Sequence, residues 1–229
     1  MKPIIGMVAR VEYPGETGKL VMNERYRKIV IKYGGNPILI MPPQNIDYTK
    51  TKYDDQDDLT KEEKEMLITQ IKLCDGIIMT GGFKINKFDR FISEYATDND
   101  IPLLGICLGM QIMANYKKKL WVVKNDSFII HKREEGDCFH KISLDKKSKL
   151  YEILKEDRFL VNSRHYYHTE PNDNYDIVAV TDDHYIEAIE MKNKRFNIGV
   201  QWHPEDMDDE YSDRLFKDFF IECKRKREM

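Results

Sequence analysis

The first half of the chain alternates short apolar runs with segments of helical periodicity. The apolar runs predict four strands: Ile4 to Ala9, Ile38 to Met41, Gly76 to Thr80 and Ile101 to Ile106. Helical periodicity predicts four helices: Asn23 to Tyr33, Thr60 to Leu73, Lys87 to Thr97 and Met110 to Lys119. Thr60 and Glu63 have the spacing of a capping box. Strands and helices in this order predict an α/β fold, with a mostly parallel central sheet flanked by helices.

The second half is richer in strands. Short strands are expected at Leu120 to Val123, Phe128 to Ile130, Phe139 to Leu144, Arg158 to Val161, Tyr175 to Thr181, Tyr185 to Met191 and Phe196 to Trp202. A turn at Asp182-Asp183-His184 predicts a hairpin, and therefore a small antiparallel region, before the chain returns to the central sheet at Ile198. A last helix is expected from Glu210 to Lys226. Without a visible repeat or linker, residues 1–229 are expected to form a single domain.

Composition narrows the function classes. The 229 residues are 41% hydrophobic and carry a net charge of −3, without a basic patch for nucleic acid. No apolar stretch reaches the roughly 18 residues of a membrane span. The opening Met1-Lys2-Pro3-Ile4 lacks a signal-peptide profile, and four unpatterned cysteines do not indicate a disulfide framework. We therefore expect a cytoplasmic enzyme that binds neither nucleic acid nor membrane.

Cys107 has the most informative sequence context. It lies within Gly105-Ile106-Cys107-Leu108-Gly109, between a predicted strand and a predicted helix. A glycine-framed nucleophile at such a junction is typical of a sharp strand-to-helix turn, where flanking Cβ atoms have no room. The thiol then lies at the positive end of the helix, which favours the thiolate. Cys107 is therefore predicted to be a nucleophile.

A base for this thiol is expected at the end of another strand. The run from Phe196 to Trp202 leads directly into His203-Pro204-Glu205. Carboxyl ends of parallel strands meet at one edge of a sheet, so His203 and Cys107 can come together. Pro204 restricts His203 to an extended backbone, and Glu205 can orient the imidazole through its second nitrogen. The alternative is that Cys107 is an inert buried thiol and His203 a structural histidine.

These two motifs, Gly105 to Gln111 and Gly199 to Glu205, closely resemble those of the class I glutamine amidotransferases. The resemblance is strongest to the free-standing γ-glutamyl hydrolase branch, which includes γ-glutamyl-γ-aminobutyrate hydrolases. It covers nearly the whole chain and implies a flavodoxin-like fold. It also implies hydrolysis of a small γ-glutamyl compound through a thioester on Cys107, with glutamate and an amine released and no cofactor.

The resemblance also implies roles for other residues. The oxyanion hole is expected from two backbone N–H groups, those of Gly82 and Leu108. The glutamyl group is expected to contact Gln111, Asn162, Ser163, Arg164 and His165. Ordinary structural roles remain open for each of these: a strand-ending turn for Gly82, a capping or solvent-facing position for Gln111, and a surface loop for Arg164.

The amine half of the substrate is not set by the sequence. The loop after Gly82 is shorter than in the hydrolase branch, and the segment at His165-Tyr166-Tyr167-His168 departs from its pattern. Lys84 and Lys87 would suit an anionic leaving group, such as a phosphate-bearing amine, although surface lysines need no such explanation. Ammonia, γ-aminobutyrate and other amines stay open.

Partners and metals complete the expectations. The alternative to a free-standing hydrolase is a glutaminase subunit that delivers ammonia to a separate synthetase or amidotransferase partner. The sequence does not set the oligomeric state and allows a homodimer. His131, His140, His165, His168 and His184 lack the spacing of a zinc site, so no metal is expected.

Overall fold

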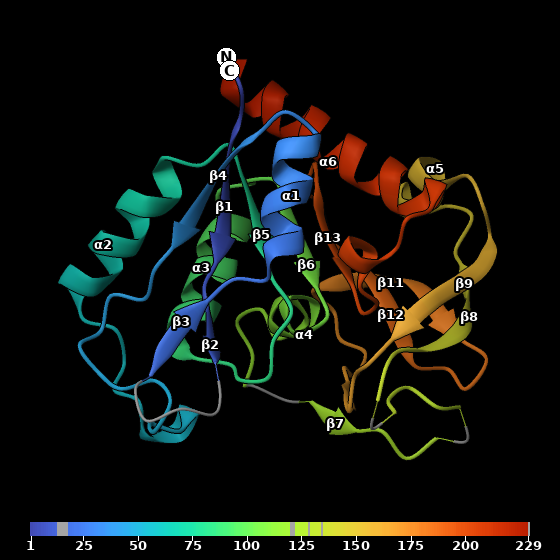
Figure 1. Ribbon diagram of the computed structural model, residues 1–229, viewed down its shortest axis with the longest axis horizontal. Helices are drawn as coiled ribbons and strands as arrows, with labels where there is room; N and C mark the ends of the chain where they lie inside the picture. The colour runs from blue at the N-terminus through green and yellow to red at the C-terminus, as the bar shows by residue number, and fades with distance from the viewer. Residues whose placement is uncertain (13–17, 120–121, 128, 134, 229) are drawn as a thin grey trace.

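The computed structural model describes residues 1–12, 18–119, 122–127, 129–133 and 135–228. Within these residues, nine strands form one sheet (Figure 1). In spatial order they are β4 (Asn36–Ile40), β1 (Ile4–Val8), β5 (Gly76–Met79), β6 (Leu103–Ile106), β13 (Asn197–Val200), β12 (Ile186–Met191), β11 (Tyr175–Thr181), β8 (Cys138–Leu144) and β9 (Arg158–Ser163). The α/β class predicted from the sequence is confirmed.

The sheet changes character at β13. From β4 to β13 all neighbouring strands are parallel, and Gly199 of β13 pairs with Gly105 of β6. On its other edge β13 pairs antiparallel with β12, where Gly199 lies opposite Ile189. The remaining pairs are antiparallel, including the predicted β11–β12 hairpin. The strand that leads to His203 is therefore the boundary between a parallel half and an antiparallel half.

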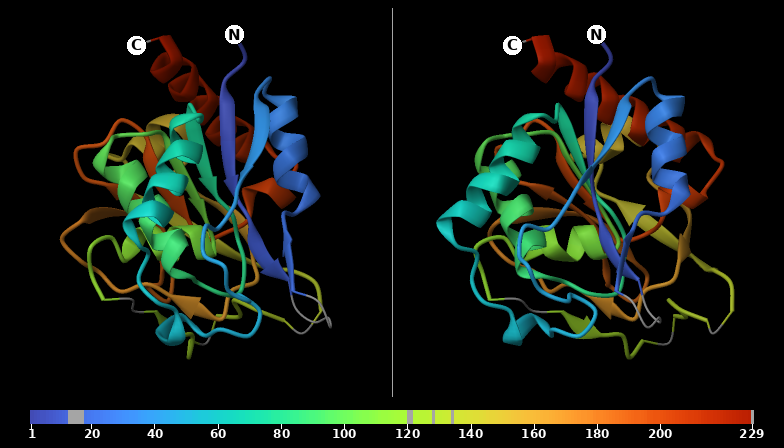
Figure 2. Two further views of the ribbon diagram at one scale, coloured as in Figure 1. Left: turned by 90° about the vertical axis from the view of Figure 1, so that its left-hand side faces the viewer. Right: turned by 60° about the vertical axis from the view of Figure 1, so that its left-hand side comes forward.

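Helices cover both faces of the sheet (Figures 1 and 2). One face packs against α1 (Glu24–Lys32), α5 (Lys149–Leu154) and α6 (Glu210–Glu228), and the other against α2 (Lys61–Lys72), α3 (Lys87–Asp98) and α4 (Leu108–Ala114). The capping box of α2 is confirmed: Glu63 N–H donates to Thr60 Oγ1 at 3.2 Å, and Thr60 N–H donates to Glu63 Oε2 at 2.8 Å. Each face thus has its own apolar core.

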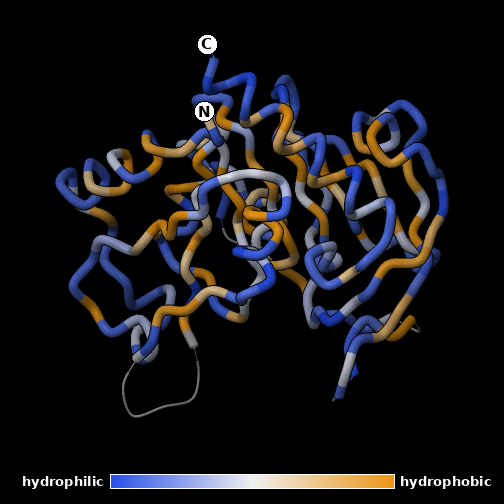
Figure 3. The backbone as a smooth tube through the Cα atoms, turned by 45° about the horizontal axis from the view of Figure 1, so that its top comes forward, coloured by the Kyte–Doolittle hydropathy of each residue, from blue (hydrophilic) through white to orange (hydrophobic). Residues whose placement is uncertain are grey.

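Hydropathy follows this layering. Figure 3 shows hydrophobic residues concentrated along the central strands and hydrophilic residues on the outer helical turns and loops. The apolar face predicted for the last helix, at Leu215, Phe216, Phe219 and Phe220, is buried in the core beneath α6. No helix of the described residues is long and apolar enough to cross a membrane.

Smaller elements lie outside the main sheet. They are the pairs β2 (Arg10–Glu12) with β3 (Lys19–Val21) and β7 (Val123–Lys124) with β10 (Tyr167–His168), and two 3-10 helices, η1 (Tyr53–Asp55) and η2 (Pro204–Asp206). Of the predicted strands at Leu120 to Val123 and Phe128 to Ile130, residues 120, 121 and 128 lie outside the described residues, and 129–130 are not a strand.

The helix expected from Met110 to Lys119 is shorter in the structure. It starts at Leu108 and ends at Ala114. Beyond it the backbone bends at Lys117, which has a φ of 50°. The α3 side chains hold this bend, because Arg90 donates to Lys118 O at 2.6 Å and Glu94 Oε1 accepts from Lys117 N–H at 3.2 Å. Tertiary contacts therefore override the helical periodicity here.

Candidate active site

Cys107 lies at a strained turn between β6 and α4. Its φ is 52° and its ψ is −106°, a conformation that residues with a Cβ rarely adopt. Backbone hydrogen bonds hold the turn on both sides: Cys107 N–H donates to Val200 O at 2.8 Å, and Gln111 N–H donates to Cys107 O at 3.1 Å. Strain of this kind persists where the surrounding structure enforces it, and it is common at functional sites.

The two flanking glycines have a steric reason. A Cβ on Gly109 would lie 2.0 Å from Met79 O, at the end of β5. A Cβ on Gly105 would lie 2.4 Å from Met113 Sδ and 2.8 Å from the carbonyl carbon of Gly109. The backbone of the turn therefore packs directly against the neighbouring strand, which is why this motif needs glycine on both sides of the cysteine.

His203 is oriented from two directions. Its Nδ1 lies 2.7 Å from Glu205 Oε1, which also accepts a hydrogen bond from Tyr26 Oη at 2.7 Å. Its backbone is held by Asn162 at the end of β9: His203 N–H donates to Asn162 Oδ1 at 2.9 Å, and Asn162 Nδ2 donates to His203 O at 3.0 Å. With Nδ1–H directed at the carboxylate, Nε2 is the nitrogen that can exchange a proton with Cys107.

Electrostatics favour an ion pair at this site. Burial lowers the pKa of His203, but the adjacent negative charges of Cys107 and Glu205 outweigh burial and raise it to about 10. Burial raises the pKa of Glu205, and the charge of His203 together with its hydrogen bonds brings the net value below the ordinary range. Burial, with the charge of Glu205 next in importance, raises the pKa of Tyr26 well above its usual value. At neutral pH, Tyr26 is therefore a neutral donor to a charged carboxylate.

Cys107, His203 and Glu205 line one cavity of about 420 Å³. Its wall includes residues that the sequence analysis did not identify, among them Arg10 and Tyr26. Arg10 is buried and bonds to Thr80 O and to the carboxylate of Asp89. Neither Arg10 nor Tyr26 belongs to a local motif, because each reaches the cavity from a separate early segment, so no signal in the sequence marks them.

The residues expected to form the oxyanion hole are adjacent. A Cβ on Gly82 would lie 3.2 Å from Leu108 Cδ2, so the glycine loop packs against the first residue of α4. The N–H of the preceding Gly81 donates to Tyr26 Oη at 2.9 Å. The oxyanion role of Gly82 and Leu108 stays a prediction that this placement supports.

Of the five residues expected to contact the glutamyl group, Arg164 is the one found among the described residues that line the cavity. Gln111 donates to Tyr167 O at 2.9 Å and to Gln201 Oε1 at 3.1 Å. Asn162 holds His203 as described above, and Ser163 Oγ donates to His131 O at 2.8 Å. Their substrate contacts stay predictions, but the structure assigns Asn162 a supporting position behind the base.

Lys84 and Lys87, the candidates for an anionic leaving group, are engaged elsewhere. Lys84 Nζ donates to Thr51 O at 2.5 Å, and Lys87 Nζ lies 2.8 Å from Asp58 Oδ1. Neither is among the described residues that line the cavity; Lys132 and Arg164 are the cations at its rim. A charged leaving group would therefore meet a different pair of side chains from the one that the sequence suggested.

Two groups of side chains could hold a metal ion among the described residues. One is His203, Glu205 and Asp206, which belongs to the cavity already described. The other consists of His131, His140, His165 and Glu187, all of them buried. The sequence analysis treated these histidines separately and did not single out Glu187, because no regular spacing connects the four positions.

Comparison with known proteins places this geometry in a family. The model of the family described as glutamine amidotransferase class-I matches residues 45–223, which include the nucleophile turn and the His-Pro-Glu motif. The chain belongs to the class I glutamine amidotransferase family. This agrees with the family resemblance of the two motifs and with a cysteine-dependent C–N hydrolase activity.

The relatives are synthases. The chain is 30% identical over 169 residues to a CTP synthase from Lactobacillus johnsonii, covering 59% of this chain and 31% of that protein. It is 32% identical over 163 residues to the glutamine-hydrolyzing subunit of the GMP synthase from Methanothrix thermoacetophila, covering 67% and 79%. The chain thus spans about a third of the length of the CTP synthases that it matches. These relatives do not support the narrower γ-glutamyl hydrolase branch.

Solved structures show the same fold. A protein described as a GMP synthase subunit from Thermoplasma acidophilum has a TM-score of 0.69 at 18% identity, covering 100% of this chain and 98% of that one. The glutaminase domain of a CTP synthase from Trypanosoma brucei, with bound acivicin, has a TM-score of 0.64 at 18% identity, covering 98% and 94%. At this identity the likeness establishes the fold alone.

Proposed function

We propose that this chain is a glutaminase that hydrolyses the γ-amide of glutamine and delivers ammonia to a synthetase partner. The observation that carries the proposal is the meeting of Cys107, His203 and Glu205 in one cavity, with the imidazole held between a carboxylate and a thiol. The kinship with synthases that contain or use such a domain favours ammonia delivery over free-standing hydrolysis.

The mechanism follows from the placement of these groups. The Cys107 thiolate attacks the γ-carbonyl carbon, and the N–H groups of Leu108 and Gly82 stabilise the oxyanion. The His203 imidazolium gives its Nε2 proton to the leaving nitrogen, and collapse of the intermediate leaves a γ-glutamyl thioester and ammonia. Neutral His203 then takes a proton from water, which attacks the thioester and releases glutamate. Glu205 keeps the imidazole in the required tautomer throughout.

A second candidate is hydrolysis of a γ-glutamyl amine whose leaving group is acidic. The favouring observation is the set of cations that line the cavity, namely Arg10, Lys132 and Arg164. The glutamyl α-carboxylate needs one cationic partner, and Arg10 is already engaged by Asp89. This leaves cationic charge at the rim, on Lys132 and Arg164, to attract an anionic group on the amine side.

One panel of substrates separates the two candidates. Purified protein is assayed with glutamine, with γ-glutamyl amides of neutral amines and with γ-glutamyl amides of acidic amines, and kcat/KM is compared. A glutaminase prefers glutamine and releases ammonia and glutamate in equal amounts. A preference of tenfold or more for an acidic amide supports the second candidate. Absence of turnover with every member of the panel, in protein whose Cys107 reacts with a glutamine-like electrophile, contradicts both.

A further inference from the structure

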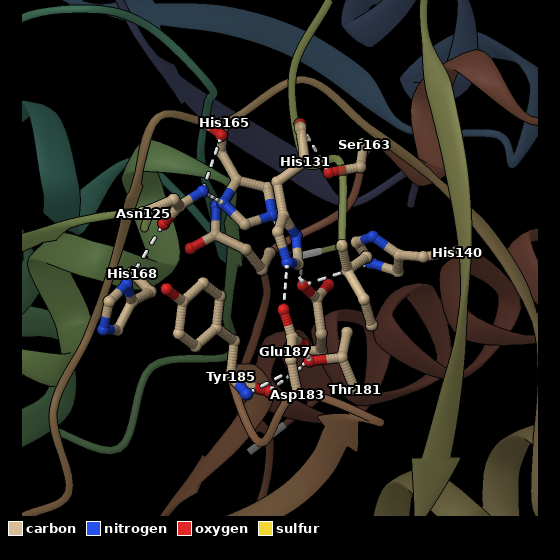
Figure 4. Close-up of polar contacts among 12 residues, drawn as sticks. Asn125, His131, His140, Ser163, His165, His168, Thr181, Asp183, Tyr185 and Glu187 are labelled. Carbon is tan, nitrogen blue, oxygen red and sulfur yellow. Dashed lines mark hydrogen bonds and ion pairs between the residues drawn. The ribbon is translucent and has the colours of Figure 1, made fainter. Parts of the chain in front are cut away.

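His131, His140, His165 and Glu187 converge in the antiparallel half of the molecule (Figure 4). His140 lies on β8, Glu187 lies on β12, His165 follows β9, and His131 lies in the segment between β7 and β8. All four are buried, with exposed fractions of 3%, 6%, 3% and 0%. One ligand atom from each lies within 4.8 Å of the others. Four groups that bind metals therefore face one another in the interior.

The atoms that face one another lack hydrogen-bond partners. Among the described residues, His131 Nδ1, His140 Nε2, His165 Nε2 and both carboxylate oxygens of Glu187 are buried without one. The His140 and His165 nitrogens lie 3.2 and 3.3 Å from Glu187 Oε1, but neither pair has hydrogen-bond geometry. A buried carboxylate and several buried imidazole nitrogens in this state are strongly unfavourable unless something binds between them.

The outer nitrogens of two rings are anchored. His131 Nε2 lies 3.0 Å from Asp183 Oδ2, and that carboxylate also accepts hydrogen bonds from two hydroxyl groups, those of Ser127 and Thr181. His165 Nδ1 lies 3.0 Å from Tyr167 O, which is closer than the amide of Asn125 at 3.3 Å. A ring that donates one N–H to a carboxylate or carbonyl presents the lone pair of its other nitrogen, as metal-binding histidines do.

The spacing fits a small tetrahedral ion. Zn²⁺ binds nitrogen and oxygen at about 2.0–2.1 Å, which places neighbouring tetrahedral ligands roughly 3.3 Å apart. The two shortest ligand separations, both from Glu187 Oε1, are 3.2 and 3.3 Å, and the third, to His131 Nδ1, is 3.9 Å. The charges balance as well, because the two negative charges of Glu187 and Asp183 match those of a divalent cation.

We propose that His131, His140, His165 and Glu187 bind a Zn²⁺ ion. A closed set of four protein ligands is typical of a structural site rather than a catalytic one. The ion would join β8, β12, the end of β9 and the segment before β8, which share no other common centre among the described residues. This proposal is independent of the proposed glutaminase activity.

The zinc site would also support the catalytic cavity. The run from Asn162 to His165 has Asn162 holding His203, Arg164 at the cavity wall and His165 at the metal. Lys132, which also lines the cavity, directly follows His131. Metal binding therefore fixes two segments that carry cavity residues, without placing the ion at the reacting atoms.

The test measures metal content in untagged full-length protein purified without chelators. Elemental analysis should find about one zinc per chain in the wild type and a loss of at least tenfold in Glu187→Gln and His140→Asn. His184→Ala is the matched control, because His184 is an exposed histidine on the β11–β12 turn and this variant should keep its zinc. Cys107→Ala should also keep it, which separates failure of this proposal from failure of the glutaminase proposal.

A second measurement guards against variants that do not fold. Wild-type protein stripped by dialysis against a chelator is titrated with Co²⁺, and one equivalent should produce the visible d–d bands of a four-coordinate ion. Rebinding of Zn²⁺ should abolish these bands and raise the melting temperature. Wild type that carries no zinc and shows no Co²⁺ bands while folded would overturn the proposal, as would equal zinc loss in His184→Ala. The four residues would then be a His–carboxylate cluster without metal.

Discussion

The parallel and antiparallel halves of the sheet assemble their polar clusters in different ways. In the parallel half, Cys107 and His203 stand just beyond the ends of strands that pair directly with each other. In the antiparallel half, His131, His140, His165 and Glu187 come from strand faces and loops with no common spacing. Chemistry at strand ends leaves compact motifs in a sequence, whereas chemistry on the interior of a folded-over sheet is dispersed along the chain.

The largest effect is expected at the nucleophile. Cys107→Ala should lower kcat for glutamine by roughly 10⁴-fold or more, because no thioester can form. Its melting temperature should stay close to that of the wild type. Cys74→Ala is the matched control, since Cys74 is another buried cysteine but lies among residues of the α2 face, and it should keep its activity. Turnover in Cys107→Ala comparable to the wild type would remove the catalytic role from the parallel half.

The next largest effect tests the tight packing of the nucleophile turn. Gly109→Ala should lower the free energy of unfolding by about 3 kcal/mol or more, because the added Cβ meets Met79 O at 2.0 Å. Gly34→Asn is the control: its φ is 81°, which asparagine tolerates, and a Cβ there meets nothing within 4 Å. Chemical denaturation of both variants should therefore show a large difference. Equal stability of the two would contradict the close backbone contact.

Glu205→Gln should change the pH dependence of activity. Glu205 raises the pKa of His203, which is about 10, so removing its charge lowers that pKa and the imidazolium is lost at lower pH. The alkaline limb of kcat/KM should move down from near pH 10, with a fall in kcat of about 10²-fold. A pH–rate profile measures both.

The same pair affects stability in a defined direction. The raised pKa of His203 contributes stability that is complete below its ordinary value of 6.5 and is lost as the pH rises through about 10. The stability advantage of the wild type over Glu205→Gln should therefore shrink between neutral pH and pH 10. An advantage that grows over this range would indicate that His203 is not the charged partner.

The smallest effect is expected where the two halves meet. Asn162→Ala removes the two hydrogen bonds that hold the His203 backbone, so kcat should fall about tenfold with little change in KM. Asn172→Ala is the control, because Asn172 donates to Ala114 O at 2.8 Å on another part of the chain. A change confined to KM would instead support the predicted contact of Asn162 with substrate.

The sequence predicted the parallel half better than the antiparallel half for physical reasons. The strands before Cys107 are continuous apolar runs bounded by glycine, proline or caps, so their elements could be located. Glycine-framed Cys107 and His203-Pro204-Glu205 were recognisable because each chemical role is local. Arg10 and Tyr26 were missed because their place in the cavity depends on tertiary packing. The histidine cluster was missed because side chains from β8, β12 and two loops meet only after the sheet has formed.

The dual pairing of β13 has a mechanical consequence. The imidazole of His203 is carried by a strand whose two edges belong to differently organised halves, while the sulfur belongs to one half only. Rotation of the halves against each other is therefore transmitted to the separation between proton donor and nucleophile. A protein that binds the outer edge at β9, which holds the histidine backbone through Asn162, can alter the hydrolysis rate from outside the cavity.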